Sequence, residues 1–401
     1  MKKTFIRFIT LLLSTCLLFT FTACDDTSDN DNVETGKYEY ELLEDDDGDK
    51  YYEITNYTVS TDDLDDLDNV DSKYRNITIP KTGADFGETG TKASIPVKKI
   101  RASAFANKTI LLSVVVGDNI ESIGEGAFAG CTNLTEITLP YVGKSADATN
   151  NEKLFAYLFG TNEVANCTAV SSKPNAFEDG AGSDIVEDTA TTYYLPNSLT
   201  KVTVTSGDIK DCAFYGVSTL TEVVFENATS IGKFAFYGAT GLESVTISNK
   251  ITHIYQSAFS GCTSLNEIIF EQNSTLEFIG KKAFYGCSKL GYTKLNTQIK
   301  PLVLPSSVNT ILESAFENCS SLKGVDLSDT AISVIDIATF QGCTSLEFIA
   351  LKNTLEIRYS AFANCDKLKK SGVIDNFTNK ASIYTTLTNV QANAFDSDIE
   401  D

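Results

Sequence analysis

The segment Ile-Gly-Glu-Gly-Ala-Phe-Ala-Gly-Cys-Thr-Asn-Leu-Thr-Glu-Ile-Thr-Leu occupies residues 123–139 and recurs along the chain. Six later copies share its spacing of Ile, Phe and Leu, the last of them in part; they begin at Ile231, Ile254, Ile279, Ile311, Ile335 and Ile357. From Phe214 onward, the central Phe residues of successive copies are mostly 22 to 25 residues apart. A period near 23 residues is typical of a solenoid, in which similar coils follow one another.

Each copy has a chemical pattern that predicts the shape of one coil. An Ile lies five residues before the Phe, a Leu six residues after it, and then apolar residues alternate, as Ile137 and Leu139 do. Alternation predicts a short strand with one buried face, and the Ala-Phe segment is long enough only for a turn of α- or 3₁₀-helix. One coil cannot bury its own apolar edge, so the coils have to stack.

The pattern Ile-x-x-x-Ala-Phe-x-x-Cys-x-x-Leu-x-x-Ile-x-Leu resembles the BspA-like leucine-rich repeat of bacterial surface proteins, over about residues 95–395. The resemblance implies an α/β solenoid, a right-handed curved superhelix of about ten coils with a parallel sheet on its concave inner face. It also implies short helical turns outside, and adhesion to extracellular matrix or to other cells as a function.

We expect four parts in the chain: a signal peptide at 1–23, an acidic tether at 24–36, a β cap at 37–94 and the repeat solenoid at 95–401. Two apolar and aromatic runs within 37–59 predict a β-hairpin that would cover the first coil. Between Pro140 and Pro196 the repeat is suspended, so we expect an insertion at 140–198 that bulges out as a loop with one short helix.

The first residues have the pattern of an export signal. Three basic residues precede an apolar stretch at 8–21 that is too short for a stable membrane span. Phe-Thr-Ala-Cys at 21–24 resembles a bacterial lipobox, which implies a lipid anchor on Cys24. The acidic run that follows resembles the surface-export signal of Bacteroidetes lipoproteins, so we expect a lipid-anchored protein of the cell envelope at its outer surface. The alternative is an ordinary secretory signal in which Cys24 is incidental.

The charge of the chain excludes one class of partner. It carries 54 acidic against 32 basic residues, a net charge of -22, and lacks the Lys and Arg footprint that a phosphate backbone requires. Residues 25–73 hold 19 Asp or Glu and three Lys, so most of the acidity belongs to the tether and cap. We expect no nucleic-acid partner.

The cysteines and the single histidine give no catalytic pattern. Six Cys stand three residues after a repeat Phe, where two other copies have Val217 and Ala239, so the position asks for a small buried apolar residue. We expect free thiols rather than disulfides or zinc ligands. His253 occupies a position that varies between copies, which predicts a surface residue. We therefore expect no enzyme activity, no metal and no cofactor.

The strand residues eight and ten positions after each Phe point away from the core and would line the concave face. We expect them to bind an extracellular protein or glycan; the candidate residues are Glu136, Lys201, Glu222, Glu267, Ile269, Tyr292, Lys294 and Phe348. Alternatively, the aromatic ones pack against the C-terminal segment at 372–384. The protein is expected to act as a monomer.

Two other roles stay open. The protein could be a glycan-capturing accessory lipoprotein of a carbohydrate-uptake system, with its site in the 140–198 insertion. It could also have a purely structural role in the envelope.

Overall fold

The computed structural model describes residues 21–22, 37–59, 72–86, 92–173, 190–291, 301–354, 356–375, 387 and 389–395. Most of the predicted signal peptide and tether, including Cys24, lies outside these residues. Of the residues described, none belongs to a helix long and apolar enough to cross a membrane.

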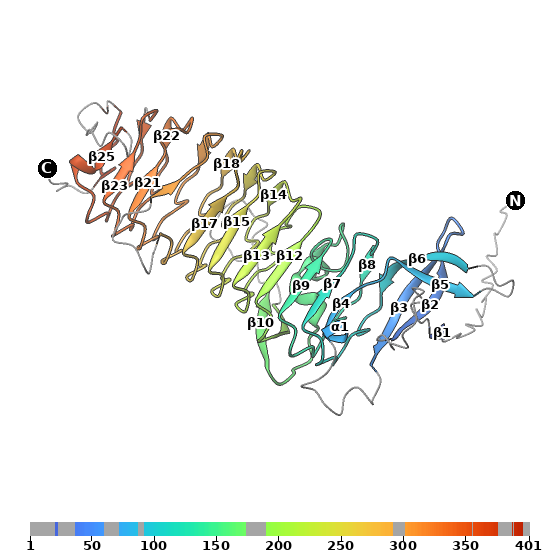
Figure 1. Ribbon diagram of the computed structural model, residues 1–401. Coiled ribbons are helices and arrows are strands. Elements are labelled where there is room, and N and C mark those ends of the chain that lie inside the picture. Colours follow the sequence, from blue (N-terminus) through green and yellow to red (C-terminus); the bar gives the residue numbers. More distant parts are fainter. Residues whose placement is uncertain are drawn as a thin grey trace, which may run out of the picture.

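The repeats form a solenoid of about eleven turns, close to the expected ten, with the coils stacked along one long axis (Figure 1). One side of the solenoid is a parallel sheet of long strands. In spatial order these are β4 (Asn76–Thr78), β7 (Ser113–Val115), β9 (Glu136–Leu139), β12 (Lys201–Val204), β13 (Glu222–Phe225), β15 (Ser244–Ile247) and β17 (Glu267–Phe270). A second stretch continues it as β19 (Leu302–Val303), β21 (Gly324–Asp326), β23 (Phe348–Ala350) and β25 (Val373–Ile374).

Two-residue strands make a second parallel row along another side of the solenoid, visible in Figure 1 as the row through β14, β18 and β22. In each of them the second residue is the repeat Ile, whose side chain is buried, and the first faces outward. The row consists of β8 (Ser122–Ile123), β14 (Ser230–Ile231), β16 (His253–Ile254), β18 (Phe278–Ile279), β20 (Thr310–Ile311), β22 (Val334–Ile335) and β24 (Glu356–Ile357).

The α/β class expected for the solenoid is not confirmed, because the Ala-Phe segments form turns and not helices. Among the described residues, the α-helix α1 (Ser72–Arg75) is four residues long, and the 3₁₀ helices η2 (Asn150–Lys153), η3 (Phe155–Phe159) and η4 (Lys370–Gly372) are short. In a typical turn, Phe234 and Gly238 both have positive φ, at 55° and 68°, which interrupts any right-handed helix. The backbone of the turn instead forms hydrogen bonds to the neighbouring coil: the N–H of Phe236 donates to the carbonyl of Ala258 in the next coil at 2.7 Å.

The repeat Phe rings stack on one another through the core. From Phe214 to Phe395, neighbouring ring centroids are 4.8 to 5.5 Å apart and their planes differ by 4° to 12°. The repeat Ile and Leu side chains that surround this ladder are buried as well. Each coil therefore buries its apolar residues mainly against its two neighbours, as the repeat pattern predicts.

The predicted hairpin is present before the first coil. Strand β2 (Lys37–Glu44) pairs antiparallel with β3 (Lys50–Thr58) and also with β1 (Phe21–Thr22). Strand β3 pairs in parallel with β6 (Lys92–Ile100), and β6 pairs antiparallel with β5 (Thr82–Phe86) and in parallel with β8. The ring of Tyr57 lies 5.7 Å from that of Phe105, the first ring of the ladder. The hairpin thus stands at the N-terminal end of the solenoid (Figure 1), and its action as a cap stays a prediction.

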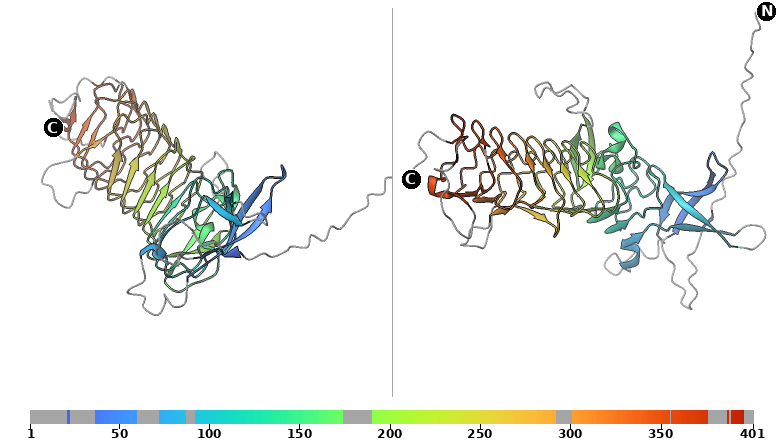
Figure 2. Two further views of the ribbon diagram at one scale, coloured as in Figure 1. Left: turned by 45° about the vertical axis from the view of Figure 1, so that its right-hand side comes forward. Right: turned by 90° about the horizontal axis from the view of Figure 1, so that it is seen from above.

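The insertion differs from the expected bulging loop, because part of it is built into the core. All five residues of η3 are buried, and the Phe155 ring lies 5.0 Å from that of Phe214. The N–H of Phe128 donates to Leu158, and the N–H of Phe155 donates to Ala213. On this side η3 takes the place of a Phe turn between two coils, whereas on the long-strand side β9 pairs directly with β12. The remaining described part contains a hairpin of β10 (Cys167–Ser172) and β11 (Thr191–Pro196), and Figure 2 places it beside the solenoid.

Candidate ligand-binding surfaces

The outward residues of the long strands form the surface predicted to bind a ligand, here called the strand face. Pairing places four of the predicted residues in one row, with Ser244 completing it; in order along the sheet the row reads Glu136, Lys201, Glu222, Ser244 and Glu267. The Lys201 ammonium lies 3.1 Å from a Glu222 carboxylate oxygen, and both side chains are about half exposed. The predicted charged residues therefore do converge on one surface, where a Lys is flanked on both sides by Glu.

A second row on the strand face is made of Thr and aliphatic side chains. It reads Thr138, Thr203, Val224, Thr246 and Ile269. Ile269 stands opposite Thr246 and is 42% exposed. An exposed β-branched side chain at the edge of a rigid sheet can be covered by a partner at little entropic cost.

The sheet is interrupted beyond Ile269. Strands β17 and β19 belong to separate sheets, and a pocket of ≈ 640 Å³ opens between them, lined in part by Ile269, Leu302 and Val303. Tyr292 and Lys294 fall in the adjoining stretch 292–300, outside the described residues, so their place on the strand face stays a prediction.

Val303 is a strand-face residue that sequence reasoning missed. Its side chain is 53% exposed, and its strand β19 pairs with β21. A signal was available, because Leu302-Val303-Leu304-Pro305 has apolar residues at the same first and third positions, and the same closing Pro, as Ile137-Thr138-Leu139-Pro140. Because this coil is longer than most, the regular repeat spacing predicted its strand near Tyr292 instead.

Phe348 contributes less open surface than predicted. It lies on β23 opposite Gly324 and is half-buried. Gly324 and Ala350, which were expected to point outward on neighbouring strands, are both buried. The segment proposed to cover Phe348 is described only up to residue 375.

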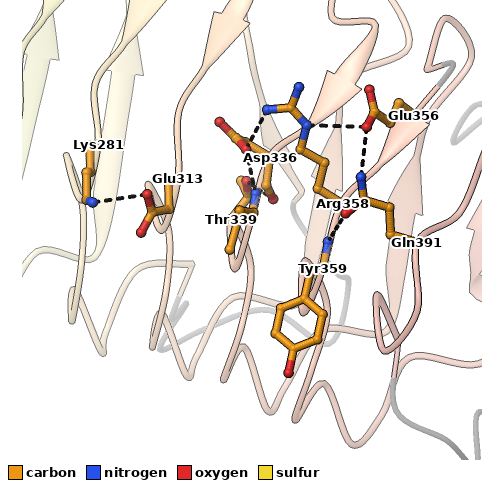
Figure 3. A network of polar contacts seen from close by, with 9 residues as sticks. Lys281, Glu313, Asp336, Thr339, Glu356, Arg358, Tyr359 and Gln391 are labelled. Atoms are coloured by element: carbon orange, nitrogen blue, oxygen red, sulfur yellow. Dashed lines mark hydrogen bonds and ion pairs between the residues drawn. The ribbon is translucent and has the colours of Figure 1, made fainter.

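The short-strand side carries a network of charged side chains toward the C-terminus (Figure 3). Arg358 lies 2.9 Å from Asp336 and 3.4 Å from Glu356, and Gln391 donates to Glu356 at 3.0 Å. The hydrogen bond from Arg358 to Asp336 raises the pKa of the guanidinium. Tyr359 and Ile337 project beside this network and are 51% and 40% exposed. The charges here are largely engaged with one another.

The six repeat cysteines lie in the core and donate hydrogen bonds. None of the eight cysteines in the described residues forms a disulfide, and seven of them are buried. Each repeat thiol donates to the carbonyl of the Phe one coil earlier, as Cys287 does to Phe259 at 3.2 Å and Cys319 to Phe284 at 3.3 Å. Burial raises the pKa of these two thiols well above 9.0, so they stay protonated and are poor nucleophiles. No group of three metal-ligating side chains occurs within the described ranges.

Comparison with known proteins agrees with the repeat pattern. The sequence pattern of the BspA type leucine-rich repeat region matches six copies, at residues 95–159, 189–303 and 295–398. A search of curated protein sequences gave no match.

Two solved structures are among the similar ones. A leucine-rich cell surface protein from Faecalibacterium prausnitzii is 20% identical, with 94% of this chain and 99% of that chain covered and a TM-score of 0.32. A leucine-rich repeat protein from Bacteroides ovatus is 18% identical, with 90% and 87% covered and a TM-score of 0.36. The repeat match by itself spans well over half of the sequence. The chain therefore belongs to the BspA type leucine-rich repeat family.

Proposed function

We propose that this protein is a lipid-anchored recognition or adhesion protein of the bacterial cell surface that binds a protein or glycan ligand through its strand face. Membership of the repeat family supports a surface location and a role in interactions, because such repeats typically form binding scaffolds and not enzymes. The anchor would be the lipid on Cys24.

The observation that carries the proposal is the ordered strand face itself. Lys201 and its flanking Glu residues lie in one row, and Ile269 and Val303 expose apolar surface next to the pocket between β17 and β19. The strands beneath are held by the buried ladder, so a partner would meet a surface that is already ordered. Charged residues of both signs would orient the partner, and the apolar side chains would supply the desolvated contact.

A pair of substitutions tests the strand face. Ile269→Asp with Val303→Asp places two charges at the apolar contact without touching the core. Immobilised fibronectin, laminin and collagen and intact epithelial cells serve as probes. We expect the mature wild-type protein to bind at least one of them, and the double variant to bind it at least tenfold more weakly, since a buried unpaired charge costs several kcal/mol.

Ile337→Asp is the matched control, because Ile337 is comparably exposed but lies on the short-strand side. It should bind like the wild type. Equal losses in the control and in the double variant would contradict a strand-face site, as would unchanged binding by the double variant.

The anchor has its own test. In cells fed an alkyne-labelled fatty acid, the wild-type protein should carry the label and fractionate with membranes, whereas Cys24→Ser should be unlabelled and released. Label retained by Cys24→Ser would show that the lipid is attached elsewhere, and an unlabelled wild-type protein would contradict lipid anchoring.

A further inference from the structure

A second pocket lies on the short-strand side, where the insertion meets the regular coils. It measures ≈ 490 Å³ and is lined by residues from four successive coils: 147–150 and Lys153 of the insertion, 208–211, Gly232 with Ser230, and Tyr255. We call it the seam pocket. With coils ~4.8 Å apart, four coils span roughly 14 Å along the solenoid axis. The pocket therefore has the form of a short groove parallel to that axis.

Tyr255 gives one end of the groove an aromatic wall. Tyr255 is 36% exposed, and its ring packs against two other rings, His253 at 5.6 Å and Phe278 at 6.2 Å between centroids. His253 and Phe278 pair on the neighbouring short strands β16 and β18, and Tyr255 directly follows β16. The backbone hydrogen bonds between these strands therefore fix the spacing of the three rings. An aromatic ring fixed in this way offers a flat apolar surface without a further ordering cost.

The rest of the groove offers hydrogen-bonding groups of both kinds. One carboxylate oxygen of Asp208 accepts from the backbone N–H groups of Thr229 and Ser230, at 2.8 and 2.9 Å, and one oxygen of Asp147 accepts from Ser145 at 2.6 Å. The Thr229 hydroxyl also donates to that Asp208 oxygen at 2.7 Å, and an ionised carboxylate has about four acceptor sites, so both Asp side chains can accept further hydrogen bonds. Lys210 donates to the Ala148 carbonyl at 2.7 Å and has two more N–H groups.

These features limit the kinds of ligand that could bind in the seam pocket. A metal ion fits poorly, because the described Asp side chains do not converge as a ligand set. An anionic ligand would face three Asp against two Lys, and an apolar ligand would leave these polar groups dehydrated and unpaired. A neutral sugar chain has hydroxyl groups that both donate and accept, and C–H faces that can stack on an aromatic ring.

We propose that the seam pocket binds a neutral oligosaccharide lying along the solenoid axis, with one sugar ring stacked on Tyr255 and the hydroxyl groups of the next rings paired with Asp208, Lys210 and Asp147. This site is separate from the strand face and does not depend on it. It would give a surface protein a glycan contact on a second side of the solenoid.

The test uses the mature protein and soluble hexasaccharides of glucose, mannose, xylose and N-acetylglucosamine, with heparin as the acidic comparison. Calorimetry should detect at least one neutral hexasaccharide, in preference to heparin. Tyr255→Ala and Lys210→Ala should each weaken that binding, Tyr255→Ala by tenfold or more. Tyr359→Ala is the matched control, because Tyr359 is also an exposed Tyr on the short-strand side; it should bind as the wild type does.

Thermal unfolding of each variant checks that the loss is not one of folding. Absence of binding by all four neutral hexasaccharides at millimolar concentration would overturn the proposal, as would equal binding by Tyr255→Ala and Tyr359→Ala. The strand-face variant with Ile269→Asp and Val303→Asp should keep its hexasaccharide binding, which separates this site from the proposed adhesion surface.

Discussion

At the scale of single residues, the repeat Cys suits its position not only by its size but also by its hydrogen bond. Its thiol reaches the carbonyl of the Phe one coil earlier, so the side chain fills a small apolar space and also donates a weak hydrogen bond, as from Cys343 to Phe316 at 3.3 Å. Val217 and Ala239 fill the same position without a donor, which fits a modest energetic role for that bond. Burial keeps these thiols neutral, so they contribute to packing and not to chemistry.

The thiols can be counted in solution. Without reductant, the denatured mature protein should react with eight equivalents of a thiol reagent, whereas the native protein should react readily only at Cys167, the one described cysteine that is not buried. Cys167→Ala should abolish the native reaction and lower the denatured count by one. Six or fewer reactive thiols after denaturation would mean that disulfides form, and fast native reaction at all eight would mean that the stacked core is open.

The same burial predicts how stability depends on pH. The pKa of Cys287 is raised above its ordinary 9.0 in the folded state, so between the two values the folded protein holds a proton that the unfolded chain has released. Folding stability is then complete below about pH 9 and falls as the pH rises further. Replacing Cys287 by Ala should make that fall less steep in alkaline urea unfolding.

At the scale of elements, the regular coils could be predicted and the insertion could not. Each regular coil can be recognised in the sequence by an Ile five residues before its Phe and a Leu six residues after it. The buried Phe155 has Asn150 and Thr161 at those positions, so nothing in the local pattern marks it as part of the ladder. The coil that follows Phe284 is longer than most, and for it the repeat spacing predicted a strand near Tyr292. The strand of this coil, β19, lies instead at Leu302–Val303.

The buried part of the insertion should therefore matter for folding. Phe155→Ala removes a fully buried ring between two coils, and we expect it to lower the free energy of unfolding by about 3–5 kcal/mol. The exposed Tyr359→Ala should change it by less than about 0.5 kcal/mol. Urea unfolding followed by circular dichroism measures both. A Phe155→Ala protein as stable as the wild type would contradict a core role for η3.

At the scale of the whole molecule, different sides of the solenoid carry different groups of side chains. The stacked rings make the interior, the long strands present the charged and aliphatic rows, and the short-strand side carries the seam pocket beside the insertion and the Arg358 network toward the C-terminus. Most of the negative charge belongs to residues 25–73, before the first coil. In the proposed arrangement this acidic part follows the lipid anchor and keeps the solenoid solvated away from the membrane.

Hydrogen exchange of the protein bound to a matrix protein or cell-surface ligand is the most direct test of recognition through the strand face. Binding through the strand face should slow exchange in β12, β13, β15 and β17 and leave the short strands β22 and β24 unchanged. Slowed exchange confined to the short-strand side, with the long strands exchanging as in the free protein, would contradict it.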